Sequence, residues 1–368
     1  MFYAFSVMLT GTAAGAEFST TALSLAYGGF VMVGGGLAFL IGRRIDRFGV
    51  RTPTLAGFGL GALGLLAFGR AAEPWQVVAA SWLMLGPAGA LTFYEPAFVA
   101  VDQWFGPRHR ARALAVLTLV GGLAGPLFLP GTERLVVAMG WRGTTVVLAA
   151  VMVGAGAVNA AALPRGIPPR VDRAATGTPP PRIWRDPRFL LFTGALACSS
   201  GGFQAVLYHR IAVFEEAGYA VAAVAVWAAA SSILSLPGRY AGPYLAERYG
   251  GISLYATATV FAAAGTGIMV GAGAWRMPAH FITFGITFGA LLPIRAVVMA
   301  RWYSGPAYGR VMGAQWSAAA VAGGLMPAVV GALRDVVGGY GPAMLAVTGL
   351  FAAAATLASI SGHRGRRE

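Results

Sequence analysis

The chain has 368 residues, of which 57% are hydrophobic and 11% charged. Because soluble domains carry about 25% charged residues, this composition excludes an ordinary soluble protein. The formal net charge of +14 would suit a nucleic-acid-binding protein, but the basic residues lie in short loops and form no basic stripe or basic–aromatic platform. The single cysteine, Cys198, excludes an intrachain disulfide and a cysteine-cluster metal site.

Twelve apolar segments follow one another along the chain. A membrane-spanning helix needs about 17–25 residues, so the pattern predicts an all-α membrane protein with twelve transmembrane helices. The first segment is short and begins at Met1, and we expect this helix to be truncated. The predicted segments are 1–16, 22–41, 53–70, 75–101, 113–131, 143–163, 188–213, 219–241, 252–273, 278–300, 311–333 and 341–361.

The loops between these segments alternate in their arginine content. One alternating set carries 19 of the 27 basic residues, all of them arginine, whereas the opposite set carries 5. Since cytoplasmic loops of membrane proteins are enriched in basic residues, the first set is predicted to be cytoplasmic. The chain is therefore expected to be a multi-pass protein of the cell (inner) membrane with both termini in the cytoplasm.

The longest polar stretch divides the chain into two related halves. Residues 164–187 are rich in proline and arginine, which predicts a cytoplasmic linker. On either side we expect a six-helix bundle, at 1–163 and at 188–368, the second ending in a short basic tail. "DRFG" at 46–49 returns as "ERYG" at 247–250, and "WFGPRHRARAL" at 104–114 returns as "WYSGPAYGRVM" at 302–312. Two pseudo-symmetric bundles around a midplane site are typical of secondary transporters.

The stretch "GRRIDRFGVR" (42–51) resembles the loop between the second and third spans of the major facilitator superfamily. In that family the aspartate caps and pairs with groups at neighbouring helix ends, which latches the cytoplasmic side while the outside is open. The resemblance implies a cytoplasmic gating motif, and the alternative is that the arginines only orient the chain. The motif and its echo comprise Gly42, Asp46, Arg47, Gly49, Arg51, Glu247, Arg248 and Gly250.

Other stretches extend this resemblance over nearly the whole chain. "GGLAGP" (121–126) and "GALRDVVGGYGPA" (331–343) look like the fifth and eleventh spans of the superfamily. "FSTTALSLAYGGF" (18–30) and "YHRIAVFEEAG" (208–218) resemble the branch that contains monocarboxylate transporters and oxalate–formate exchangers. The resemblance implies a carrier of small organic anions.

Arg239 has the spacing of an arginine that pairs with the substrate carboxylate in monocarboxylate carriers. It lies eight residues before Glu247, and a guanidinium can hold a carboxylate through two parallel hydrogen bonds. The chain departs from that pattern at Ser235, where those carriers have an aspartate, so their proton-coupling scheme does not transfer directly. The alternative is a snorkelling arginine near the cytoplasmic end of its span.

Glu95 and Arg295 lie at similar depths in the fourth and tenth predicted spans. Because ionised residues inside a membrane are costly, they usually face a cavity. We expect the two side chains to face a central cavity from opposite bundles, where they close the inner side or bind substrate and proton. Glu95 is the carboxylate that lies well inside a span, which makes it a candidate for proton coupling. The alternative is a structural pair within one bundle.

Weaker candidates for contacts with substrate are Tyr94, Gln204 and Tyr208. His209 is a second candidate for proton coupling because histidine titrates near neutral pH, although a lone histidine at an interface is more often an anchor. Arg210, next to it, is expected to snorkel to the outer interface.

The sequence contains no catalytic constellation, phosphate-binding loop or histidine spacing of a metal site, so we expect neither an enzyme nor a cofactor. It predicts a secondary transporter that moves a small organic anion by rocker-switch alternating access, coupled to protons or by exchange. Its partners would be that substrate and the lipid bilayer, without nucleic acid, and the protein would be a monomer. The alternatives are an efflux carrier for hydrophobic compounds and, more remotely, a membrane sensor that transports nothing.

Overall fold

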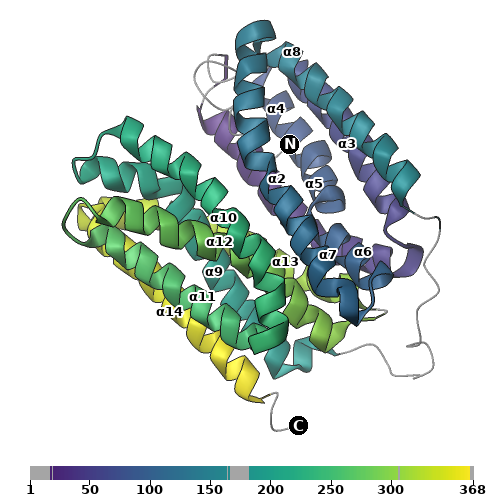
Figure 1. Cartoon of the computed structure of the whole chain (residues 1–368). Helices are drawn as coiled ribbons and strands as arrows, with labels where there is room; N and C mark the ends of the chain where they lie inside the picture. Colours follow the sequence, from purple (N-terminus) through teal and green to yellow (C-terminus); the bar gives the residue numbers. More distant parts are fainter. Residues whose placement is uncertain (1–16, 19, 164, 166–181, 306, 365–368) are drawn as a thin grey trace. The chain divides into compact units, whose positions relative to one another are not determined.

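The computed structural model describes residues 17–18, 20–163, 165, 182–305 and 307–364, which form helices and turns with no β-strand (Figure 1). The helices are α2 (Thr20–Phe48), α3 (Arg51–Gly69), α4 (Pro74–Ala80), α5 (Gly86–Thr92), α6 (Tyr94–Trp104), α7 (Pro107–Gly122), α8 (Ala124–Ala162), α9 (Pro187–Glu216), α10 (Val221–Tyr249), α11 (Gly251–Gly267), α12 (Arg276–Tyr303), α13 (Tyr308–Val337) and α14 (Tyr340–Arg364). A π-helical turn, η2 (Ser81–Leu85), and two 3₁₀ turns, η3 (Ile183–Arg185) and η4 (Ile268–Val270), complete them.

The helices agree with the apolar segments predicted from the sequence. Each predicted segment from 22–41 to 341–361 falls on helix, whereas the segment 1–16 lies outside the described residues. Among the described residues, 9 helical stretches are long and apolar enough to cross a membrane. One of them, Arg108–Ala162, has 55 residues and contains two of the predicted segments. The prediction of an all-α membrane protein is therefore confirmed.

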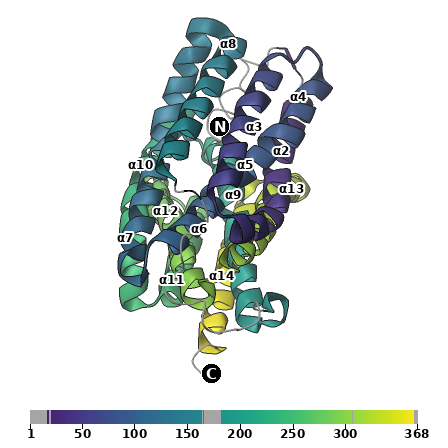
Figure 2. The same cartoon turned by 90° about the vertical axis from the view of Figure 1, so that its right-hand side faces the viewer.

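Glycine interrupts the longest helix where the sequence predicted a loop. Inside α8, Gly140 has a φ of +72°, a conformation that side-chain-bearing residues rarely adopt. The predicted fifth segment, 113–131, is built from α7 and the first part of α8, and the sixth, 143–163, follows Gly140. This last part of α8 lies beside α3 in both views (Figures 1 and 2), and a Cβ at Gly156 would stand 3.1 Å from Phe58.

The fourth predicted span is not one continuous helix. It consists of α4, η2, α5 and α6, and between α5 and α6 the residue Phe93 leaves the helical region with φ −79° and ψ −159°. Pro96 has no N–H group to bond the carbonyl of Thr92 one turn earlier, which explains the break. The side-chain hydroxyl of the same residue, Thr92, donates a hydrogen bond to the carbonyl of Ala88 at 2.7 Å. The break places Glu95 in the first turn of α6.

Packing groups the helices into two units that are each discontinuous in sequence. The first unit comprises 1–106, 124–180 and 304–317, and the second comprises 107–123, 181–303 and 318–368. Thus α7 packs with α10 and α12 of the second half, and the start of α13 groups with helices of the first half. The predicted bundles 1–163 and 188–368 stay a prediction, and most of the predicted linker lies outside the described residues.

Hydrogen bonds from Trp141 and Arg142 to Glu17 stabilise one end of the first unit's hydrophobic core. Trp141 packs edge-on against Phe18 and Phe68 at ring distances of 6.0 and 5.9 Å. Its indole N–H donates to Glu17 at 3.0 Å, and the guanidinium of Arg142 donates to the same carboxylate oxygen at 2.6 Å. The hydrogen bonds from Arg142 and Trp141 lower the pKa of Glu17 below its ordinary value. Glu17 therefore ties the start of the described chain to α8.

In the second unit, α10 and α12 approach each other through glycines. A Cβ added to Gly289 would lie 2.0 Å from the carbonyl oxygen of Ser235, and one added to Gly238 would lie 2.2 Å from that of Ile286. Small residues allow such backbone contact, which supplies much of the packing energy of helices in lipid.

Replacing Gly289 with alanine should therefore destabilise the protein, because the added methyl group overlaps the backbone of α10. We expect a loss of about 1–3 kcal/mol in the free energy of unfolding, measured by thermal unfolding in detergent. The matched control is Gly349→Ala in α14, where an added Cβ meets nothing within 4 Å. Equal stabilities of the two variants would contradict the close approach of α10 and α12.

Candidate functional site

Asp46 caps the beginning of α13. It lies in the last turn of α2, and its two carboxylate oxygens accept the backbone N–H groups of Gly309 and Arg310, both at 2.8 Å. The first N–H groups of a helix have no partner within the helix and carry its positive dipole end, so an anion is stabilised there. The residues of this contact, 46 and 309–310, belong to the first packing unit. The aspartate of the predicted gating motif thus binds a helix end.

Small residues make this contact possible. A Cβ at Gly42 would lie 2.0 Å from the carbonyl oxygen of Gly309, and one at Gly313 would lie 2.1 Å from that of Ala38. Further along the same contact, the Ser317 hydroxyl donates to the carbonyl of Gly35 at 2.7 Å. Since Gly309 and Gly313 are one helical turn apart, as are Ala38 and Gly42, the two backbones touch along successive turns.

The other residues of the predicted gating motif occupy the ends of neighbouring helices. Gly49 (φ +80°) and its echo Gly250 (φ +94°) both adopt the left-handed conformation, each between two helices. The Arg51 guanidinium donates to the carbonyl of Ala160 at 2.7 Å, near the C-terminus of α8, where a cation is favoured.

Two arginines of the motif lie over aromatic rings, and Glu247 contacts a neighbouring helix through its backbone. The guanidinium carbons of Arg47 and Arg248 lie 5.2 Å from the ring centres of Phe48 and Tyr249. The backbone carbonyl of Glu247 accepts a hydrogen bond from Arg301 at 2.8 Å.

A second aspartate binds the turn just before α13. Asp102, near the end of α6, accepts the Ser304 hydroxyl at 2.7 Å and the backbone N–H of Gly305 at 3.3 Å. This side chain was not among the predicted site residues. Together with Asp46, it holds the segment 304–310 against the first-unit helices α2 and α6.

Glu95 lies just after the helix break of the fourth span, in a stretch whose aromatic side chains pack against one another. Glu95 is buried, with 7% of its surface exposed. Its neighbour Tyr94 stacks on Phe98 at 5.6 Å and meets Phe93 edge-on at 5.2 Å, and Phe93 packs against Trp316 at 6.1 Å. A carboxylate in the first turn of a helix is favoured by the helix dipole, which offsets part of the cost of burial.

Arg239 lies buried in the second packing unit among α7, α10 and α12. Its Nε donates to the Ser235 hydroxyl at 3.4 Å, one guanidinium N–H reaches the carbonyl of Thr118 at 3.5 Å, and the guanidinium lies 6.0 Å from the Phe288 ring centre. On α7, a Cβ at Gly122 would stand 2.6 Å from the side chain. Ser235, which replaces the aspartate of monocarboxylate carriers, thus contacts this arginine directly.

Arg295 is the largest fully buried side chain in α12, with 0% of its surface exposed. It belongs to the second packing unit, whereas Glu95 belongs to the first. The expected encounter of these two groups across a cavity therefore stays a prediction.

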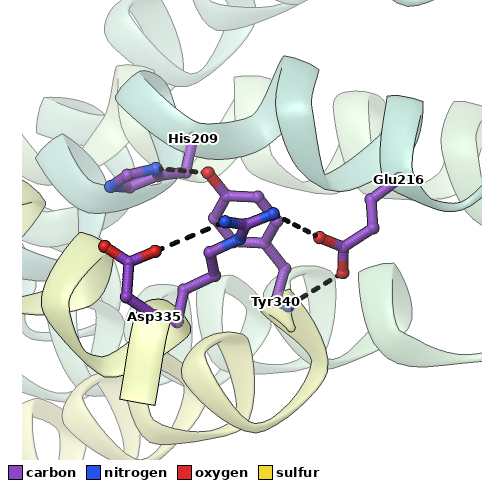
Figure 3. A network of polar contacts seen from close by, with 5 residues as sticks. His209, Glu216, Asp335 and Tyr340 are labelled. Carbon is purple, nitrogen blue, oxygen red and sulfur yellow. Dashed lines mark hydrogen bonds and ion pairs between the residues drawn. The ribbon is translucent and has the colours of Figure 1, made fainter. Parts of the chain in front are cut away.

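His209 belongs to a polar network that joins α9, α13 and α14 (Figure 3). Its Nε2 lies 2.9 Å from the carbonyl of Pro327 and its Nδ1 lies 3.1 Å from the Tyr340 hydroxyl. Since a carbonyl only accepts, Nε2 carries a proton. Glu216 accepts the backbone N–H of Tyr340 at 2.9 Å and the Arg334 guanidinium at 3.4 Å. His209 is buried in this network, unlike a simple interface anchor.

Three neighbours of His209 on α9 have different environments. Tyr208 is 72% exposed, and Gln204 is half-buried against α13, where its side chain would lie 3.1 Å from a Cβ at Gly323. Arg210 extends toward α10 and α12, where it donates to the Ser231 hydroxyl at 3.1 Å. Among the described residues, no group of three or more His, Cys, Asp or Glu side chains could hold a metal ion.

A family model for the Major Facilitator Superfamily matches residues 1–284. The chain belongs to the Major Facilitator Superfamily. Monocarboxylate transporter 13 of Bos taurus is 27% identical over 319 residues, which cover 83% of this chain and 72% of that protein. Human monocarboxylate transporter 11 is 26% identical over 313 residues, covering 80% of this chain and 65% of that protein.

Solved structures share the fold of this superfamily member. A fucose:proton symporter of E. coli has a TM-score of 0.75 at 16% identity and covers 98% of this chain and 96% of its own. The human organic anion transporter MFSD10 has a TM-score of 0.74 at 16% identity, with coverages of 97% and 89%. The protein is a multi-pass membrane transporter with the all-helical superfamily fold, and it is not an enzyme.

Sequence reasoning missed several polar groups that bind buried arginines or a helix end in this transporter. Ser231, Thr118 and Asp102 are common residue types in unremarkable positions, and each contacts a residue far away in sequence. Only Asp102 offered a signal, because it lies two positions before one of the two repeated stretches.

Asp46→Ala should weaken the transporter's fold because it leaves two N–H groups at the start of α13 without their carboxylate. Loss of a helix cap costs about 1–2 kcal/mol, and we expect a drop of that size in the free energy of unfolding in detergent. Asp335→Ala is the matched control, because that side chain is 74% exposed and pairs with its neighbour Arg334. A loss no larger for Asp46→Ala than for the control would argue against the cap.

Proposed function

We propose that this protein is a secondary active transporter that moves a small organic anion, of the monocarboxylate type, coupled to protons or by exchange. The observation that carries the proposal is the burial of two arginines, Arg239 in α10 and Arg295 in α12. Ionised groups at such depth are costly and mark substrate or ion pathways in membrane proteins. A guanidinium fork fits a carboxylate through two parallel hydrogen bonds.

The relatives support the same substrate class. The curated proteins that match most of the chain are named monocarboxylate transporters. Arg239 adds a local reason, because its guanidinium is buried in the second packing unit, where it contacts Ser235, Thr118 and Phe288. An acidic, aromatic cavity would favour the alternative of an efflux carrier for hydrophobic or cationic compounds.

The proposed mechanism is alternating access between two six-helix bundles, twelve membrane helices in all, around a central site. Both termini would face the cytoplasm of a cell with this protein in its inner membrane, and the protein would act as a monomer. In this scheme the Asp46 contact with α13 holds one state closed at the cytoplasmic side. Opening that side would require the two hydrogen bonds of Asp46 to be replaced by hydrogen bonds to water. The net free-energy cost of this replacement is small where water is present, as it is near a membrane surface.

Glu95 would be the group that carries the proton. It is buried in the first turn of α6, directly after a helix break. Tyr94, Gln204 and Tyr208 are proposed as polar contacts for the substrate, and His209 as a second proton-coupling group. The gating role is proposed for Gly42, Asp46, Arg47, Gly49, Arg51, Glu247, Arg248 and Gly250.

Uptake into liposomes tests the proposed function directly. The purified protein would be reconstituted and supplied with labelled monocarboxylates, with and without a pH gradient. Saturable uptake of at least one carboxylate, stimulated by the gradient or by carboxylate inside the vesicle, is expected. Transport of cationic or neutral hydrophobic compounds without any carboxylate transport would contradict the proposal and favour efflux.

Glu95→Gln separates transport from proton coupling. The amide keeps the size of the side chain but cannot exchange a proton, so uptake driven by a pH gradient should fall at least about tenfold, while carboxylate exchange at equal pH persists. Glu215→Gln, an exposed carboxylate at the end of α9, is the control and should behave as wild type. Unchanged gradient-driven uptake in Glu95→Gln would remove Glu95 from the coupling mechanism.

A further inference from the structure

The side chain of Arg210 extends toward α10 and α12 and not toward the end of its own helix, as a snorkelling arginine would. It lies six residues before the end of α9, and the acidic residues Glu215 and Glu216 follow it. Its guanidinium instead reaches Ser231, ten residues into α10, or about 15 Å along that helix from its start. Glu216 bonds Arg334 and Tyr340, not Arg210. The Arg210 charge is therefore held within the membrane-spanning part of the second unit.

The described surroundings of this guanidinium are neutral. Its centre lies 5.3 Å from the ring centre of Phe281 and 5.9 Å from that of Phe284, both buried residues of α12. Ser231 accepts one of its N–H groups and turns its own proton to the carbonyl of Ala228 at 2.8 Å. Among the residues that the structure describes, no carboxylate pairs with Arg210 and no acceptor besides Ser231 bonds it.

This leaves most of the guanidinium's donors available to a ligand. Arginine presents its N–H groups in a planar fork that matches an oxyanion. Lipid hydrocarbon offers no acceptor, so the free donors need water or an anion to offset their burial. The side chain keeps partial exposure, so a ligand can reach it. Ser231 and the two phenylalanine rings fix the direction in which the fork faces.

A second polar group on α12 shares the same aromatic wall. His280 is fully buried, and its ring lies 4.9 Å from Phe281 and 5.3 Å from Phe284, the two rings that contact Arg210. Its Nδ1 lies 2.8 Å from the carbonyl of Gly265, so the Nδ1 carries the proton and Nε2 keeps a lone pair. Within the described residues, Nε2 has no hydrogen-bond partner. Because this lone pair only accepts hydrogen bonds, it cannot bond a carboxylate, and His280 contributes to the site only as part of its wall.

From this arrangement we infer that Arg210, oriented by Ser231 and flanked by Phe281 and Phe284, forms a binding subsite for the carboxylate of the transported substrate. The subsite is distinct from the one proposed at Arg239, and the inference rests on the proposed transport of organic anions. The oxyanion at Arg210 could come from a substrate or from a lipid phosphate, which have the same acceptor chemistry. The observations favour the substrate, because Ser231 draws the guanidinium toward the membrane interior and away from the headgroups.

Binding to the full-length protein in phosphatidylcholine liposomes tests the subsite. The probes are the labelled monocarboxylate that wild type transports best and the neutral amide of the same compound. Arg210→Gln should raise the Kd for the acid by about ten- to a hundred-fold while leaving the Kd for the amide unchanged. Arg210→Lys should fall between wild type and Arg210→Gln, and Ser231→Ala should weaken acid binding a few-fold. Arg134→Gln, an exposed arginine of α8, is the control.

Three results would overturn the subsite. An unchanged Kd for the acid in Arg210→Gln removes the residue from substrate binding, and equal losses for acid and amide make its role purely structural. A change confined to thermal stability in liposomes that contain phosphatidylglycerol, with the Kd unchanged, assigns the anion to a lipid. If wild type binds no carboxylate at all, the proposed function fails together with the subsite. If Arg210→Gln does not fold, the Kd values for the acid and the amide are compared in Arg210→Lys and Ser231→Ala.

Discussion

Lipid cannot solvate charges or backbone polar groups, and this constraint explains the arrangement of nearly every polar residue described above. Asp46 binds the N–H groups at a helix end, and the imidazole of His209 bonds the carbonyl of Pro327. Such bonds require helices to approach closely, and glycines such as Gly42 and Gly289 provide the space. The small residues are therefore needed for the polar groups to reach their partners on neighbouring helices.

The same constraint separates two kinds of charged residue. Asp46 and Asp102 lie near helix ends, where water can replace their partners. Arg210 and Glu95 lie in helical stretches long and apolar enough to cross a membrane, and Arg239 is buried in α10; at such places, replacement of a partner needs a ligand, a proton or water in a pathway. The break before Glu95 fits this division, because irregular backbone at membrane depth is tolerated where it is buried or borders a pathway.

Hydropathy and loop charge predicted the helices well, because lipid imposes both patterns directly on the sequence. The position of the break at Phe93 was not predicted, although Pro96 supplies its physical cause. The bond from Asp46 to the start of α13 joins residues more than 260 positions apart, so only the resemblance to a known motif pointed to it. The direction of the Arg210 side chain was not predicted, because its position in α9 alone does not determine it. Ser231 on α10 and two rings of α12 do.

The central claim is that the ionised side chains inside the membrane helices border a path that water and substrate can enter. Single cysteines at positions 95, 239 and 295, in a chain whose Cys198 is replaced by serine, test it most directly with a membrane-impermeant thiol reagent. The account predicts that these positions react from at least one side of the membrane. Cysteines at all three positions that stay unreactive from both sides, in variants whose thermal unfolding matches wild type, would contradict it.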